Sequence, residues 1–179
     1  MAGATNGSRT TAVLSSDYVA GLDALGMEEL RDRRDQALAE REYQSYLRRL
    51  IQVRQDLLQN ERSRRAAGGA PGGVVDRLKA VLAEGPQGRG RGEAPRFALP
   101  DADVAEAERR ADGALPQGSL ANLETLTDDQ LDGGLATLGQ AERAVSADRA
   151  AVIRVHDRLQ EELKRRYRDD PSQVLRGGE

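Results

Sequence analysis

The stretch SYLRRLIQVRQD at residues 45–56 and the stretch SADRAAVIRVHD at residues 146–157 carry Ser, Arg and Asp at the same relative positions, 101 residues apart. The same offset relates further positions on both sides, among them Leu25 with Leu126, Leu30 with Leu131, Leu58 with Leu159, Glu61 with Glu162, and Arg64-Arg65 with Arg165-Arg166. A repeat that only built a core would preserve apolar positions. The repeated polar residues therefore indicate binding.

The composition favours long exposed helices over a thick globular core. The chain has 179 residues, of which 3% are aromatic and 32% are charged, a combination that leaves little material for a deep core. It has no cysteine, so disulfides and thiolate chemistry are excluded, which suits a reducing cytoplasm. No stretch has the length and apolar character of a signal peptide or a membrane span. We therefore expect a cytoplasmic protein without membrane contact.

Local signals divide the chain into five segments. Residues 1–24 are expected to form a disordered tail, 25–66 a first long helix, 67–122 a flexible linker with short helices, 123–168 a second long helix, and 169–179 a second tail. Gly26 is a tolerated N-cap for the first helix, and the Gly- and Pro-rich residues 66–73 end it. Thr127 and Gln130 form a capping box at the start of the second. Within the linker, Val74–Glu84 and Asp101–Asp112 have helical patterns.

The two long segments predict an all-α fold. Helices of about 40 residues would each be about 60 Å long and need a partner along that length. We expect an antiparallel two-helix coiled-coil hairpin with a short helical, partly disordered insert and flexible tails. Gly133, Gly134 and Gly139 weaken the second helix by about 1 kcal/mol each relative to alanine, so that helix should depend on packing or on a ligand.

A helical projection places the repeated polar residues on one stripe of each helix, roughly 80° wide. An apolar flank beside that stripe can form the seam of the hairpin; it consists of Leu47, Ile51 and Leu58 on the first helix and Ala141, Val152 and Leu159 on the second. A further apolar stripe on the first helix has no counterpart on the second, and either the linker helices or a partner protein should cover it. Its residues are Tyr46, Leu50, Val53 and Leu57.

The chemistry of the polar stripes points to a guanine nucleotide. Arginine reads guanine O6 and N7 with two parallel hydrogen bonds, and an ionised aspartate accepts the N1–H and N2–H₂ edge of the same base. Serine hydroxyls and further arginine donors suit phosphate oxygens. In an antiparallel hairpin two identical stripes are related by a pseudo-twofold axis, so the ligand should be symmetric. A cyclic diguanylate meets all of these requirements.

The repeated residues resemble the signature Glu-x3-Ser-x2-Arg-x3-Gln-x3-Asp of the RsiG-type anti-sigma factors of actinobacteria. The first copy is matched by Ser45, Arg48, Gln52 and Asp56, and the second by Glu142, Ser146, Arg149 and Asp157. Two positions depart from the signature, because Arg41 replaces the first Glu and Ile153 replaces the second Gln. Losing these groups should weaken the site or change which half binds first.

The resemblance implies a cytoplasmic switch that is not an enzyme and has no cofactor. In this family two antiparallel helices hold an intercalated cyclic di-GMP dimer as a regulatory ligand. The ligand-bound form sequesters a WhiG-like sigma factor of the sporulation and motility class from RNA polymerase. The residues that match the signature would then bind cyclic di-GMP, and no DNA contact is expected.

Two other functions stay open from the residues alone. A structural coiled-coil scaffold would make the repeat a record of duplication, with no response to cyclic di-GMP. A nucleic-acid binder would use the arginine clusters at the helix ends, although cations there also suit the helix dipole. An enzyme is disfavoured, because the chain has no phosphate loop, dinucleotide-binding glycine pattern or metal-ligand cluster. Its one histidine, His156, has only a helix neighbour, Asp157, beside it.

Overall fold

The computed structural model describes residues 6–68, 99–115, 120 and 123–171. The two long helices occur in the predicted order, and no strand occurs among the described residues, which confirms the all-α prediction. The elements are α1 (Asn6–Val13), the 3₁₀ turns η1 (Ser16–Tyr18) and η2 (Leu22–Ala24), α2 (Met27–Ala66), α4 (Asp101–Gly113), the 3₁₀ turn η3 (Leu123–Thr125) and α5 (Asp128–Asp169). In the described part of the chain, no helix is both long and apolar enough to cross a membrane.

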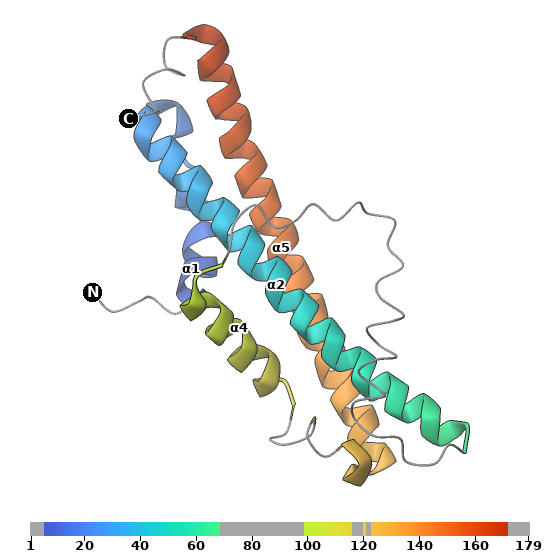
Figure 1. The fold of residues 1–179 in the computed structure, drawn as a ribbon. Coiled ribbons are helices and arrows are strands. Elements are labelled where there is room, and N and C mark those ends of the chain that lie inside the picture. The colour runs from blue at the N-terminus through green and yellow to red at the C-terminus, as the bar shows by residue number, and fades with distance from the viewer. Residues whose placement is uncertain (1–5, 69–98, 116–119, 121–122, 172–179) are drawn as a thin grey trace. The chain divides into compact units, whose positions relative to one another are not determined.

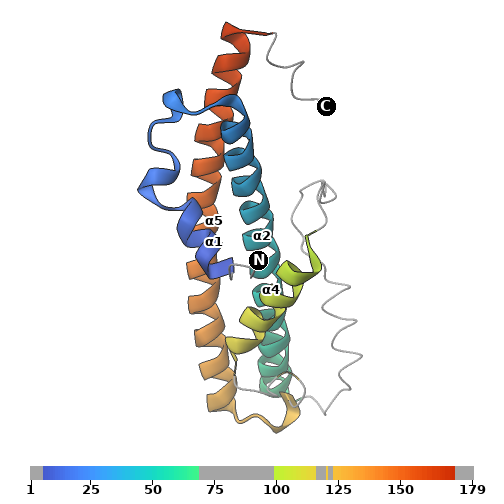
Figure 2. The same cartoon turned by 90° about the vertical axis from the view of Figure 1, so that its left-hand side faces the viewer.

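The chain forms two compact units, and both long helices contribute a segment to each. Unit 1 comprises Met1–Ser45 with Ser146–Glu179, and unit 2 comprises Tyr46–Val145. Within each unit the segments of α2 and α5 lie side by side (Figure 1, Figure 2). In unit 1 α2 contacts α5 at Arg31–Tyr167 and Ser45–Arg149, and in unit 2 at Arg48–Glu142 and Arg62–Asp132. Residue numbers fall along α5 as they rise along α2, so the pairing is antiparallel as predicted.

A seven-residue period of buried side chains runs along both long helices. On α2 it comprises Leu30, Ala37, Gln44, Ile51 and Leu58; on α5 it comprises Leu131, Leu138, Val145, Val152 and Leu159, each 101 residues after its counterpart. A strict seven-residue repeat keeps one face of a helix toward its partner and is the pattern of a coiled coil. Of the seam predicted from the sequence, Leu47 is also buried, whereas Ala141 is half-buried.

The start of α5 confirms the predicted capping box. The backbone N–H of Thr127 donates to Gln130 Oε1 at 2.8 Å, and the N–H of Gln130 donates to Thr127 Oγ1 at 3.2 Å. These two bonds satisfy backbone donors that a helix start leaves without partners. The predicted start of α2 is also confirmed, because this helix begins at Met27, directly after Gly26.

The first 24 residues differ from the disordered tail expected from their composition. From Asn6 onward they form α1, η1 and η2, and Val13 is 1% exposed in a core that includes Leu30 and Val152. A buried polar cluster fastens α1 to α2: Thr10 Oγ1 donates to Glu40 Oε1 at 2.6 Å, and Arg9 Nε donates to Glu40 Oε2 at 2.7 Å. Local composition could not reveal this order, because the partners of α1 lie about 30 residues away.

Unit 2 contains α4 (Asp101–Gly113), which spans the whole predicted Asp101–Asp112 helix and one further residue at its C-terminal end. Two of its alanines, Ala107 and Ala111, are fully buried, and Arg54 of α2 forms an ion pair with Asp112. Small residues allow the helix to approach α2 closely. The other helix predicted in the linker, Val74–Glu84, lies outside the described residues.

Candidate ligand-binding site

In unit 2 the structure brings together two predicted residues from different copies of the motif. Arg48 Nε on α2 donates to Glu142 Oε1 on α5 at 2.7 Å. The side chains are 38% and 20% exposed, respectively. The contact is therefore a partly buried ion pair across the hairpin, in which the arginine remains open on one side to solvent.

In unit 1 the corresponding contact is made by a different pair. Arg149 Nε on α5 donates to Ser45 Oγ on α2 at 2.9 Å, and the Ser45 hydroxyl donates to the backbone carbonyl of Arg41 at 2.8 Å. The Ser45 hydroxyl thus accepts a hydrogen bond from α5 and donates one to the backbone of α2, one turn earlier. Here the arginine is held by a neutral group.

The remaining motif residues lie on the same two helices and differ in their exposure to solvent. Gln52 and Ser146 are half-buried, while Asp56 and Asp157 are exposed. Among the described residues neither aspartate forms an ion pair with an arginine. Asp157 Oδ1 lies 3.3 Å from the Nδ1 atom of its neighbour His156. The two carboxylates are therefore accessible acceptors.

The two departures from the signature have different surroundings. Arg41 forms an ion pair with its neighbour Glu42 at 2.8 Å and so does not replace the missing carboxylate. Ile153 is half-buried on α5, so its side chain has access to solvent as Gln52 does.

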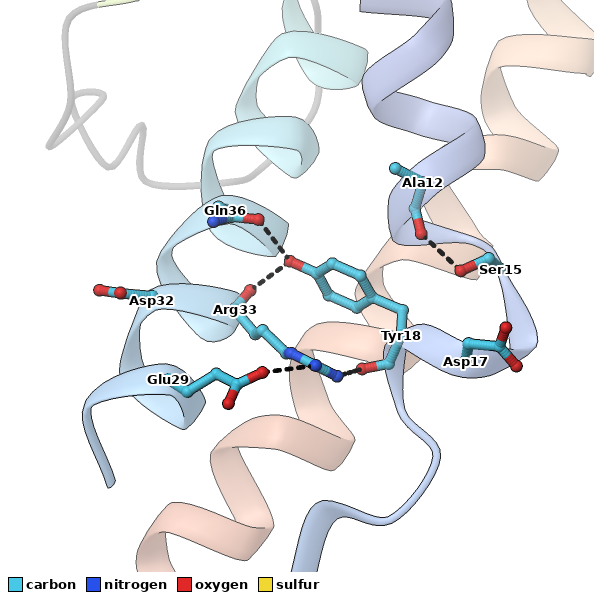
Figure 3. A pocket seen from close by; sticks show the side chains of 8 residues that line it. All are labelled: Ala12, Ser15, Asp17, Tyr18, Glu29, Asp32, Arg33 and Gln36. Carbon is cyan, nitrogen blue, oxygen red and sulfur yellow. Dashed lines mark hydrogen bonds and ion pairs between the residues drawn. The ribbon is translucent and has the colours of Figure 1, made fainter. Parts of the chain in front are cut away.

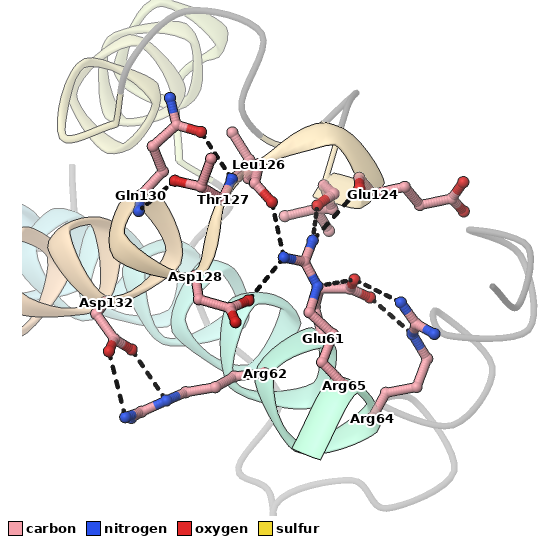
Figure 4. Close-up of polar contacts among 11 residues, drawn as sticks. Glu61, Arg62, Arg64, Arg65, Glu124, Leu126, Thr127, Asp128, Gln130 and Asp132 are labelled. Carbon is pink, nitrogen blue, oxygen red and sulfur yellow. Dashed lines mark hydrogen bonds and ion pairs between the residues drawn. The ribbon is translucent and has the colours of Figure 1, made fainter. Parts of the chain in front are cut away.

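The outer ends of the repeat form two clamps that sequence analysis did not foresee. Arg65 at the end of α2 donates to the carbonyls of Leu126 at 2.7 Å and Leu123 at 2.9 Å in unit 2 (Figure 4). In unit 1, Arg166 donates to the carbonyls of Leu25 and Leu22, the positions 101 residues earlier. Each terminal arginine thus holds the 3₁₀ turn that precedes the opposite long helix. The 101-residue offset also relates Leu22 to Leu123, and this relation could have indicated from the sequence that the two ends are built alike.

A buried or half-buried glutamate orients each clamp. Hydrogen bonds from Arg64 and then from Arg65 lower the pKa of Glu61 to about 2, although burial opposes the shift. Hydrogen bonds from Arg165 and Arg166 lower the pKa of Glu162 to about 2 in the same way. Both carboxylates are therefore ionised over the whole physiological range, and the arginine clusters at the helix ends have internal partners.

A shallow pocket in unit 1 shows how the N-terminal segment meets α2 (Figure 3). The Tyr18 hydroxyl lies 2.9 Å from the carbonyl of Arg33 and 3.1 Å from Gln36 Oε1. Arg33 Nη1 donates in return to the Tyr18 carbonyl at 2.8 Å. Burial raises the pKa of Tyr18 to about 12, against the opposing charge of Arg33. The phenol is thus a neutral donor that fixes the segment, and we assign it a structural role.

Comparison with known proteins agrees with the motif. Residues 16–82 match the family model described as RsiG-like. This range contains the whole first motif copy, and the second copy lies beyond it. No curated protein matches the chain. Over this part of its length, the chain is therefore similar to the RsiG-like family.

Proposed function

We propose that this protein is a cytoplasmic anti-sigma factor that binds cyclic di-GMP through the motif residues of α2 and α5. The observation that carries this proposal is the pair of contacts between α2 and α5 made by Arg48 and Arg149, one in each unit. A purely structural repeat would not need a polar arginine at the same motif position of both helices. The RsiG-like match over the first copy supports the same conclusion.

The chemistry of the motif residues fits the ligand. A guanidinium can donate two parallel hydrogen bonds to guanine O6 and N7, and the accessible carboxylates of Asp56 and Asp157 can accept from N1–H and N2–H₂. The hydroxyls of Ser45 and Ser146 suit phosphate oxygens, and Ser45 would exchange its bond to the Arg41 carbonyl for one to the ligand. Because each motif copy supplies one such set, two ligand molecules are expected per chain.

The partner in this proposal is a WhiG-like sigma factor of the sporulation and motility class. The apolar stripe predicted for it lies on α2 within unit 2. Val53 is 43% exposed, and Tyr46, Leu50 and Leu57 are half-buried. An apolar stripe that stays partly open to solvent supports a protein partner. Ligand binding would bring the sigma factor to this surface and keep it from RNA polymerase.

Calorimetric titration of the purified chain with cyclic di-GMP tests the ligand. Asp56→Ala and Arg149→Ala should each weaken binding by about 1.5–3 kcal/mol, because each removes a charged hydrogen-bonding group. Arg62→Ala is the matched control, since Arg62 forms an exposed ion pair with Asp132 near the end of α2. Cyclic di-AMP should not replace the ligand. Unchanged titration curves for both motif variants would show that the motif residues do not bind cyclic di-GMP.

The sigma factor should bind cooperatively with the ligand. Saturating cyclic di-GMP is expected to tighten sigma binding by about 1–3 kcal/mol, and linkage requires the sigma factor to tighten ligand binding by the same factor. Leu50→Asp should weaken sigma binding while leaving ligand binding intact. Equal sigma affinity with and without ligand would contradict the switch, and a fully competent Leu50→Asp variant would contradict the surface.

One observation favours a second candidate, a coiled-coil scaffold without a ligand. The buried heptad positions and the terminal clamps give a structural reason for much of the repeat. A scaffold would show the same far-UV circular dichroism and melting temperature with and without cyclic di-GMP. The clamps also weaken the nucleic-acid alternative, because Arg65 and Arg166 already donate to backbone carbonyls.

A further inference from the structure

The two motif arginines occupy different electrostatic situations. Arg48 donates to a carboxylate, Glu142, at 2.7 Å. Arg149 donates to a hydroxyl, Ser45, at 2.9 Å, and within the described residues no carboxylate lies within 4.0 Å of its guanidinium nitrogens. One arginine is therefore charge-compensated by the protein, while the other keeps a larger share of its attraction for an anion.

The difference follows from a single departure in the repeat. Glu142 lies one helical turn before Ser146, and the position with the same place in the first copy, one turn before Ser45, is Arg41. Arg41 directs its guanidinium to Glu42 at 2.8 Å and adds positive charge near the first copy. If position 41 carried glutamate, Arg149 would have the same carboxylate partner in unit 1 that Arg48 has in unit 2.

An ion pair on Arg48 has to be exchanged when a ligand binds there. Arg48 donates its Nε–H to Glu142, so this edge of the guanidinium cannot donate parallel bonds to guanine or to a phosphate until Glu142 is released. The released carboxylate then faces an anionic ligand. Arg149 has only a neutral hydroxyl to exchange. Because a carboxylate acceptor binds a guanidinium more strongly than a neutral hydroxyl does, the exchange is less favourable at Arg48.

We propose that the two motif copies are inequivalent half-sites. Arg149 binds the first guanine nucleotide. Glu142 forms an ion pair with Arg48 and so raises the dissociation constant of the second. This inference rests on the proposed function and adds an order to it. It identifies Glu142 as a regulatory residue that competes with the ligand, although the signature alone would count it as a ligand-binding residue.

Titration with cyclic di-GMP tests the order. The wild-type protein should show two steps whose dissociation constants differ by about tenfold. Glu142→Gln should tighten the weaker step by about three- to tenfold and leave the tighter step unchanged. Arg41→Glu should weaken the tighter step and bring the two steps together. Glu29→Gln, which removes a carboxylate from an exposed ion pair with Arg33, is the matched control and should change neither step.

A second readout needs no ligand. In the ¹⁵N–¹H spectrum of the arginine Nε groups, Glu142→Gln should shift the Arg48 signal and leave the Arg149 signal in place, whereas Arg41→Glu should do the reverse. Two equal steps that Glu142→Gln does not alter would overturn the inference and leave the proposed function standing. Absence of any binding heat would overturn both. If the Arg48 signal does not shift in Glu142→Gln, the ion pair on which the inference depends is absent in solution, and the inference is wrong.

Discussion

Replacing Arg65 with alanine should destabilise the protein far more than replacing Arg62, three residues earlier on the same helix. Arg65 Nη1 and Nη2 donate to the carbonyls of Leu126 and Leu123, and Nε donates to Glu61 at 2.8 Å. The Arg65 side chain is 22% exposed. The Arg62 side chain is 54% exposed and pairs with an equally exposed carboxylate of Asp132.

The expected loss in the free energy of unfolding follows from the hydrogen bonds that Arg65→Ala removes and from how far they are buried. Hydrogen bonds to charged groups contribute about 1.5–3 kcal/mol when desolvated, but the partners of Arg65 are near the surface, and water replaces part of the loss. Arg64 continues to neutralise Glu61 in the variant. We therefore expect a loss of about 2–3 kcal/mol in the free energy of unfolding, against about 0–1 kcal/mol for the exposed pair of Arg62.

The assay is urea and thermal unfolding followed by circular dichroism at 222 nm. For a chain of this length the expected loss lowers the melting temperature by roughly 5–10 °C. Arg65→Lys should recover only part of it, because one ammonium cannot reproduce the fork that reaches two carbonyls. Arg166→Ala should match Arg65→Ala, since it makes the same contacts in unit 1. Equal stability of Arg65→Ala and Arg62→Ala would refute a stabilising role for the Arg65 hydrogen bonds. Full recovery by Arg65→Lys would refute the need for two guanidinium donors.

Two further perturbations test the packing and the charges. Because the folded pKa values of Glu61 and Glu162 are lowered from 4.5 to about 2, their contribution to stability should be complete above about pH 4.5 and be lost as the pH falls toward 2. An acid titration followed at 222 nm measures it, and glutamine at both positions should flatten that part of the curve. Gly133→Ala should stabilise the helix by about 0.5–1 kcal/mol, because an added Cβ meets nothing within 4 Å. Gly134→Ala should lack that gain, since its Cβ would lie 2.7 Å from Leu58 Cδ2, and equal melting temperatures for the two variants would contradict the close packing.

Several features of the site could be predicted from residues alone because they are local or repeated. The motif positions follow from a fixed offset of 101 residues, and a helix turns by a constant angle, so the shared polar face follows from spacing. The cap at Thr127 and Gln130 depends on residues three apart. The pairing of Arg48 with Glu142 could not be predicted, because two side chains 94 residues apart meet only through the register of the hairpin.

The sequence by itself determined the two long helices and the composition of the motif, since apolar spacing and capping act within a few turns of helix. The length of the two helices predicted their antiparallel pairing. Only the tertiary structure decided which partner each arginine takes, that α1 is fastened to α2 through Glu40, and that the terminal arginines hold opposite turns. The physical reason is the range of the interactions. Hydrogen bonds and ion pairs weaken when the distance between donor and acceptor changes by less than 1 Å. The distances between remote segments are set only after the helices have packed.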